Sequence, residues 1–148
     1  MGKTISKDIP LAEIVLRKYE SPGNLKDREL IRKLCLSIGL LQPGDSRDIV
    51  VDVFQVFLEN KDKTMDSKEI NSMVIEVRKK NNLPLKGVAP SNIRRQVKRL
   101  RDLFLVEKIQ NNYRITEREQ MIDLFENKIQ KYYLNNIIER VREYFKAI

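Results

Sequence analysis

The sequence predicts a mainly α-helical protein that contains one β-hairpin and ends in a long helix. Along most of the 148-residue chain, apolar residues recur three and four positions apart, which is the period of an amphipathic helix. Residues 105–116 differ, because two short β-type runs flank the polar turn Gln110-Asn111-Asn112. Beyond Thr116, which can cap a helix, the helical spacing resumes and predicts a single helix over residues 117–147.

The N-terminal region, residues 1–45, is expected to form a helical extension. Its apolar spacing predicts one helix at about residues 10–20 and a second, more regular helix over residues 26–39. Gly39 and the Pro43-Gly44 pair that follows it end the second helix, because both residue types interrupt helical backbone.

Two helices and a short extended piece are expected next. Asp45 or Ser46 can cap the first helix, because either side chain can accept from the free amides of its first turn. Residues 63–65 are predicted to be extended. The motif Asp66-Ser67-Lys68-Glu69 resembles a capping box, and the second helix starts there and runs to about Lys80.

The following helix is the most basic part of the chain. The segment 91–104 reads SNIRRQVKRLRDLF, and either Pro90 is its first helical residue or Ser91 caps it. Its apolar residues fall in one narrow stripe, so this face can be buried without burying any charge. The stripe consists of Ile93, Val97, Leu100 and Phe104.

The net charge of +8 is unevenly distributed. Residues 46–116 hold 15 Lys and Arg against 9 Asp and Glu, whereas residues 117–148 hold 6 of each and are neutral. Residues 94–101 hold five cations and no acid, and an ordinary solvated helix face would mix the two signs. We therefore expect a polyanionic partner. The Arg78-Lys79-Lys80 cluster is explained by its place at a helix end, with a secondary phosphate role left open.

The composition argues against several kinds of chemistry. The chain has no His and a single Cys, Cys35, so an internal disulfide and a Cys–His metal site are both excluded. The commonest general base is missing and the glycines form no phosphate loop, so we expect no enzymatic activity, cofactor, metal or small-molecule ligand. Because the sequence has no long apolar run and no secretory leader, we expect a cytoplasmic, nucleoid-associated protein and no membrane association.

The order of elements over residues 46–116 resembles a winged helix-turn-helix domain of the kind found in prokaryotic transcriptional regulators. The motif residues are MDSKEI in the supporting helix, SNIRRQVKRLRDLFLVEK in the recognition helix and its exit, and KIQNNYRIT in the wing. The connection before the basic helix departs from the pattern, because it has about nine residues where a helix-turn-helix has about 3–4. The wing is also short, so deep insertion into a minor groove is not expected.

The resemblance implies that the basic helix enters the major groove of double-stranded DNA. Arg95 and Lys98 then project towards base edges, with Ser91 and Asn92 at the leading end of the helix. The cations on the flanks suit phosphates, which position a protein without reading sequence. The expected phosphate contacts are Arg94, Arg99 and Arg101, to which the wing adds Lys108 and Arg114.

The C-terminal segment, residues 117–148, is longer than is needed to cover the apolar surface of one such domain. It either folds back on the N-terminal helices or pairs with a second copy, and we favour a homodimer, because two-fold symmetry can place two basic helices one DNA turn apart. The sequence thus predicts a sequence-specific, double-stranded-DNA-binding transcriptional regulator. The alternative is a winged-helix module for protein–protein assembly in a larger nucleic-acid-processing complex. RNA binding is disfavoured because no aromatic residues interleave with the basic face.

Overall fold

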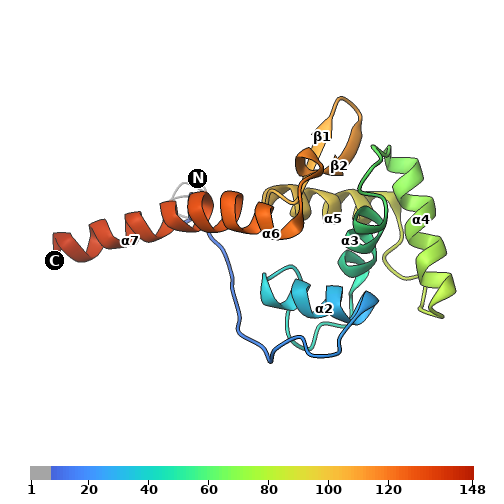
Figure 1. Cartoon of the computed structure of the whole chain (residues 1–148), viewed down its shortest axis with the longest axis horizontal. Coiled ribbons are helices and arrows are strands. Elements are labelled where there is room, and N and C mark those ends of the chain that lie inside the picture. The colour runs from blue at the N-terminus through green and yellow to red at the C-terminus, as the bar shows by residue number, and fades with distance from the viewer. Residues whose placement is uncertain (1–7) are drawn as a thin grey trace, which may run out of the picture.

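The computed structural model describes residues 8–148 and is mainly helical, with one small antiparallel sheet and a long C-terminal helix (Figure 1). Within these residues the elements before the sheet are α2 (Asp27–Ser37), α3 (Ile49–Glu59), α4 (Ser67–Lys80) and α5 (Pro90–Asp102). The hairpin consists of β1 (Val106–Ile109) and β2 (Asn112–Ile115), and a 3-10 turn (Thr116–Arg118) follows it. The C-terminal helix then comprises α6 (Met121–Leu124), a π-helical stretch (Phe125–Leu134) and α7 (Asn135–Ala147).

The fold class expected from the sequence is confirmed at this level, and the order of elements is compatible with a winged helix-turn-helix. Residues 1–7 of the expected N-terminal extension lie outside the described residues. Among the helices of residues 8–148, none combines the length with the apolar character that a bilayer-spanning segment requires.

Helix α3 lies at the centre of the hydrophobic core, and α2, α4 and α5 pack around it. Its sequence, IVVDVFQVFLE, is apolar around most of its circumference, as expected of a helix enclosed by others. Phe54 and Phe57 are fully buried in α3, and Ile70 of α4 and Leu100 of α5 are buried beside them. Each such side chain contributes about 1.5–3 kcal/mol on burial, so the core holds the basic helix α5 firmly in place.

The helix expected at residues 10–20 is wrong, because this segment is extended. Exposed and partly buried residues alternate along much of it, which is the period of an extended chain. The end of α2 holds the segment: the Arg17 N–H donates to the Ser37 carbonyl at 2.8 Å. Gly39 permits the close approach, because a Cβ at that position would lie only 2.8 Å from Cβ of Val15. The helix expected over residues 26–39 is confirmed as α2.

The hairpin is confirmed, with Val106 opposite Ile115 at its base and Ile109 opposite Asn112 at its tip. Met65 adds a one-residue third strand. Its N–H donates to the Tyr113 carbonyl at 2.9 Å, and the Tyr113 N–H donates back to the Met65 carbonyl at 2.8 Å. The extended piece expected at residues 63–65 therefore anchors the hairpin to the start of α4.

Two of the expected helix starts are confirmed. Asp66 and Glu69 form the capping box, in which the Asp66 carboxylate accepts from the Glu69 N–H at 2.9 Å. Of the two starts left open for the basic helix, Pro90 is the one observed, because it is the first residue of α5 and Ser91 does not cap.

Two other expected caps are wrong. Neither Asp45 nor Ser46 caps α3, which begins only at Ile49. Thr116 does not cap the C-terminal helix, because its hydroxyl donates to the Phe104 carbonyl at 2.7 Å. The backbone turns once more through the 3-10 turn, and the C-terminal helix begins at Met121 instead.

The C-terminal helix is buried at its root and exposed at its far end. Helix α7 extends away from the rest of the molecule, and none of its residues is buried (Figure 1). At the root, Leu124 and Ile129 face the core, whereas Ile122 is 60% exposed. The five-residue spacing of the two buried positions matches the i→i+5 hydrogen bonding of a π-helix.

Candidate nucleic-acid interface

Helix α5 buries its apolar stripe and presents its cations to solvent. Ile93, Val97 and Leu100 pack into the core against α3 and α4. The opposite face carries exposed polar residues, which are Ser91, Arg94, Arg95, Lys98, Arg101 and the single acid Asp102. The core therefore positions four cations on one outward face, as the sequence pattern predicts.

Three of these cations are unpaired. Within residues 8–148, Arg94, Arg95 and Arg101 make no side-chain hydrogen bond and no ion pair. Lys98 does pair, with Asp102 at 3.1 Å, but both side chains are more than 60% exposed. An exposed pair of this kind contributes about 0–1 kcal/mol, so Lys98 can readily exchange it for a phosphate or a base.

Arg99 does not belong to the outward face. Its guanidinium is half-buried and donates to the Gln96 side chain at 2.8 Å and to the Leu40 carbonyl at 2.5 Å. Arg99 thus ties α5 to the chain that follows α2. The phosphate contact expected for Arg99 does not fit this position, because the helix wheel cannot reveal that the N-terminal extension covers that flank.

Asn92 also faces the protein rather than solvent. Its side-chain amide donates to the Gly87 carbonyl at 2.7 Å, and its oxygen accepts from Gln96 at 3.2 Å. Asn92 therefore fixes the loop that leads into α5. The adenine contact expected for Asn92 would require both of these hydrogen bonds to break.

The two cations of the hairpin have different surroundings. Lys108 is exposed, with its Nζ 5.7 Å from the centre of the Tyr113 ring. Arg114 is paired with Glu107 at 2.7 Å across the two strands, and both side chains are largely covered. Burial acts to raise the pKa of Glu107, but hydrogen bonds from the Glu117 N–H and from Arg114 outweigh it, so the pKa is lowered. Arg114 is a structural partner and not a free phosphate contact.

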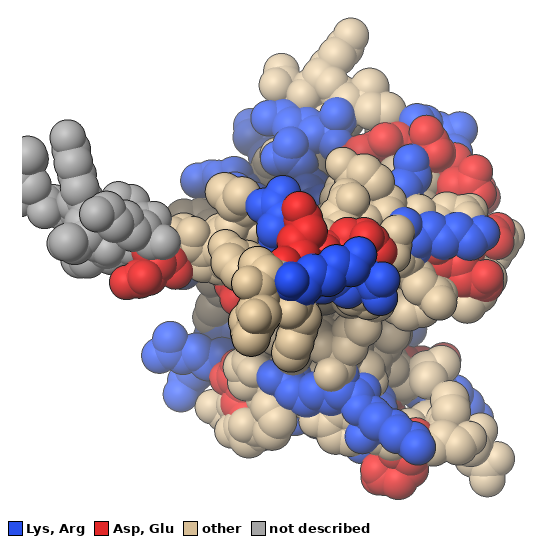
Figure 2. Space-filling model, turned by 90° about the vertical axis from the view of Figure 1, so that its left-hand side faces the viewer, with Lys and Arg blue, Asp and Glu red and all other residues tan. Residues whose placement is uncertain are grey.

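A polar groove of about 450 Å³ lies between the end of α5, strand β1 and the C-terminal helix. Four cations line it, and all of them except Lys128 are expected DNA contacts from the sequence pattern. Lys128 lies far along the chain on a neutral segment, so neither spacing nor local charge marks it. The cations are Lys98, Arg101, Lys108 and Lys128, and Asp102 and Glu107 also line the groove. In the view along the C-terminal helix, Lys and Arg side chains gather beneath the uncharged tip of the hairpin (Figure 2).

Arg78 lies in the interior, and the secondary phosphate role left open for it does not fit. It is 4% exposed, and its guanidinium bonds to Asp52 at 2.6 Å and to Asp48 at 3.2 Å. Arg28 reaches the same two carboxylates at 2.9 and 3.0 Å. Burial acts to raise the pKa of Asp48, but the two guanidinium groups outweigh it and lower the pKa. This four-residue network joins α2 and α4 to the start of α3.

Metal-ligating and nucleophilic side chains are the other groups of the described residues that could carry chemistry. Within residues 8–148, no group of three or more Cys, Asp and Glu side chains is arranged to hold a metal ion. Cys35 is fully buried, and burial raises the pKa of its thiol to about 12, so the reactive thiolate is scarce at neutral pH. The outward face of α5 and the adjoining groove are therefore the best candidates for a functional surface.

Comparisons of the chain with protein-family models, with curated proteins and with solved structures find no match. The charges and geometry of α5, the hairpin and the groove are therefore the basis for inferring a function.

Proposed function

We propose that this protein is a double-stranded-DNA-binding transcriptional regulator that acts as a homodimer. In this proposal residues 46–116 form a winged helix-turn-helix domain, α5 is the recognition helix and the β1–β2 hairpin is the wing. The observation that carries the proposal is the outward face of α5, where Arg94, Arg95 and Arg101 are exposed and unpaired within the described residues.

The surroundings of α5 support insertion into a major groove. That groove is wide enough to admit a helix, and α5 buries its apolar stripe and Gln96 while its cationic face stays exposed. Arg95 and Lys98 lie at the middle of the exposed face and are assigned to base edges, where Arg and Lys pair with guanine acceptors. Arg94 and Arg101 flank them and are assigned to phosphates, with Ser91 at the leading end.

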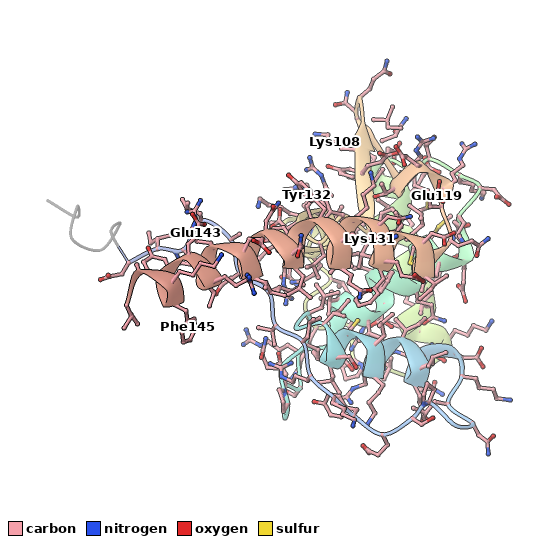
Figure 3. The ribbon with its side chains drawn as sticks, turned by 60° about the vertical axis from the view of Figure 1, so that its left-hand side comes forward. Lys108, Glu119, Lys131, Tyr132, Glu143 and Phe145 are labelled. Carbon is pink, nitrogen blue, oxygen red and sulfur yellow. The ribbon has the colours of Figure 1, made fainter. Side chains whose placement is uncertain are left out.

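The projecting helix α7 supports the homodimer. Its exposed apolar residues recur at spacings of three and four, and Tyr144 and Phe145 are 72% and 73% exposed. These residues are Ile138, Val141, Tyr144 and Phe145 in α7 and Ile148 directly after it. Residues 117–148 have no net charge, so two copies can pack these stripes together without like-charge repulsion. Figure 3 places Phe145 and Glu143 on this projecting part, well away from the hairpin.

The direct test is binding to labelled duplex DNA, single-stranded DNA and RNA of equal length over a range of salt concentrations. We expect a preference for the duplex and a steep salt dependence, because released counterions drive phosphate binding. Selection from a random duplex pool then yields the preferred site. The control is Lys26→Ala, which removes an exposed cation before α2, a helix that lies at the end of the molecule opposite the hairpin (Figure 1). Equal weak binding to all three nucleic acids would contradict the proposal.

One observation favours the assembly module as a second candidate. An apolar groove of about 490 Å³ lies between the extended N-terminal segment, α2 and the root of the C-terminal helix. Three exposed apolar side chains line it: Leu16 is 44% exposed, Leu34 is 38% exposed and Ile122 is 60% exposed. A protein partner seated there would shield apolar surface that water now reaches. A module of this kind would bind a protein tightly and DNA no better than any basic protein does.

A further inference from the structure

The polar groove beside α5 brings together cations from three separate elements. Arg101 comes from the last turn of α5, Lys108 from strand β1 and Lys128 from the π-helical stretch of the C-terminal helix. Lys128 lies 20 positions beyond Lys108 in the sequence, and the fold brings it to the two cations at the end of α5 and the start of the hairpin. In Figure 3, Lys108 extends from the hairpin above the C-terminal helix that carries Lys128.

The two acids in the groove are already occupied. Asp102 accepts from Lys98 at 3.1 Å. Glu107 accepts from Arg114 at 2.7 Å and from the Glu117 N–H at 2.9 Å. Arg101, Lys108 and Lys128, by contrast, form no ion pair among residues 8–148. In the free protein the groove therefore offers three positive charges without ion-pair partners among the described residues, and both of its acids are paired. When Lys98 turns to DNA, Asp102 is the one acid that loses its partner.

The position of the C-terminal helix against this groove is set by an aromatic contact. Phe104, two residues after α5, has a left-handed conformation, φ 64°, which is strained for a bulky residue. Its ring meets Tyr132 edge-on at 6.0 Å and Tyr133 at 5.4 Å, both about one turn beyond Lys128 on the C-terminal helix. The helix that carries Lys128 is thus attached directly to the end of the basic helix.

We propose that this groove is a second DNA contact, which holds the phosphate backbone of the duplex whose major groove α5 enters, with Lys128 as its added cation. The inference rests on the proposed function and extends the interface beyond the helix and wing onto the C-terminal helix. Lys98 and Arg101 belong to both surfaces, so the groove is continuous with the outward face of α5. An open groove that continues a helix face suits an extended polyanion better than an isolated phosphate.

The test compares Lys128→Ala with Lys131→Ala in binding to a random-sequence duplex between about 50 and 200 mM salt. Lys131 is a matched control, because it is an exposed lysine on the same helix that does not line the groove. Each phosphate contact contributes about 0.9 to the slope of log affinity against log salt. We expect Lys128→Ala to flatten the slope by about this amount, so that wild type loses about threefold more affinity than the variant over this range. Lys131→Ala should match wild type.

The Arg95→Ala variant shows whether an unexpected result contradicts only the groove contact or the proposed DNA-binding function as a whole. If Arg95→Ala weakens duplex binding while Lys128→Ala and Lys131→Ala both match wild type, the groove is not a DNA contact although the function stands. If wild type shows no preference for the duplex, both are wrong. The unfolding midpoint of Lys128→Ala should stay close to that of wild type, because the partly buried Lys128 side chain makes no hydrogen bond or ion pair within residues 8–148. An equal drop in affinity for both lysine variants would also contradict the groove contact, because it would indicate a non-specific charge effect.

Discussion

The Arg78 guanidinium lies 2.6 Å from the Asp52 carboxylate, and both side chains are almost completely buried. The pair joins α4 to α3 across 26 positions of sequence, and Arg28 of α2 completes it with a second guanidinium. Because a buried charge without its partner is costly, these three helices are locked in the arrangement that supports α5. The supporting frame of the candidate interface therefore depends on a buried polar network as well as on apolar packing.

The buried network gives a stability prediction. Asp52→Asn should lower the free energy of unfolding by about 3–5 kcal/mol, because it removes the fully buried carboxylate of the two that Arg78 and the partly buried Arg28 share. Urea denaturation followed by circular dichroism measures the change. Asp102→Asn is the control, because it breaks an exposed pair and should cost less than about 1 kcal/mol. Similar losses for the two variants would show that the network is not a stabilising contact.

The lowered pKa of Asp48 gives a pH prediction. A carboxylate whose folded pKa lies below its unfolded value stabilises the protein fully above the unfolded value, about 3.9, and that contribution disappears as the pH falls through the folded pKa. Stability should therefore fall on acidification below about pH 5. The gap in unfolding free energy between wild type and Asp48→Asn should be widest above that pH and narrow below it. A gap that stays constant from pH 7 to pH 3 would contradict this assignment.

Two arginines of α5, four positions apart, should behave in opposite ways. Arg95→Ala should weaken specific DNA binding by about 1–3 kcal/mol and relax base preference, with no effect on stability. Arg99→Ala should leave the DNA salt slope unchanged and lower the free energy of unfolding by about 1–3 kcal/mol, because it removes charge-assisted hydrogen bonds to Gln96 and Leu40. Anisotropy titration and urea denaturation of both variants measure the two effects. If Arg99→Ala instead reduced the slope of log affinity against log salt, Arg99 would contact a phosphate, as expected from the sequence.

The projecting helix gives an oligomer prediction. Replacing Tyr144 and Phe145 together by Glu should convert a dimer to a monomer, because four unpaired charges would face one another in the paired stripes. Light scattering after size exclusion measures the mass, and circular dichroism should be unchanged because both side chains are exposed. Arg140→Ala is the control on the same helix. A wild-type chain that is monomeric at high micromolar concentration would remove the dimer from the proposal.

The elements were predictable where local sequence decides them. The capping box at Asp66 and Glu69, the proline start of α5 and the Asn-rich hairpin all follow from preferences of a few adjacent residues. The helix expected at residues 10–20 failed because tertiary contacts override its pattern. The segment bonds to the end of α2, and only the folded structure brings Arg17 and Ser37 together.

The candidate site was predictable in its centre and not at its edges. The wheel of α5 correctly separated the buried Ile93 and Val97 from the exposed Arg95 and Lys98. It could not assign Arg99, because the cover on that flank comes from another part of the chain. Nor could spacing reveal Lys128, since a π-helical stretch shifts side chains away from the 3.6-residue period used to read the sequence.

The length of α7 has a mechanical consequence. Its 13 residues rise about 1.5 Å each, so the helix acts as a lever of about 20 Å fixed only at its root. A tilt of about 10° at the root then moves the tip by about 3–4 Å. In the proposed dimer, two copies joined at these tips would adjust the distance between their basic helices without separating, so we expect DNA sites with slightly different half-site separations to be bound.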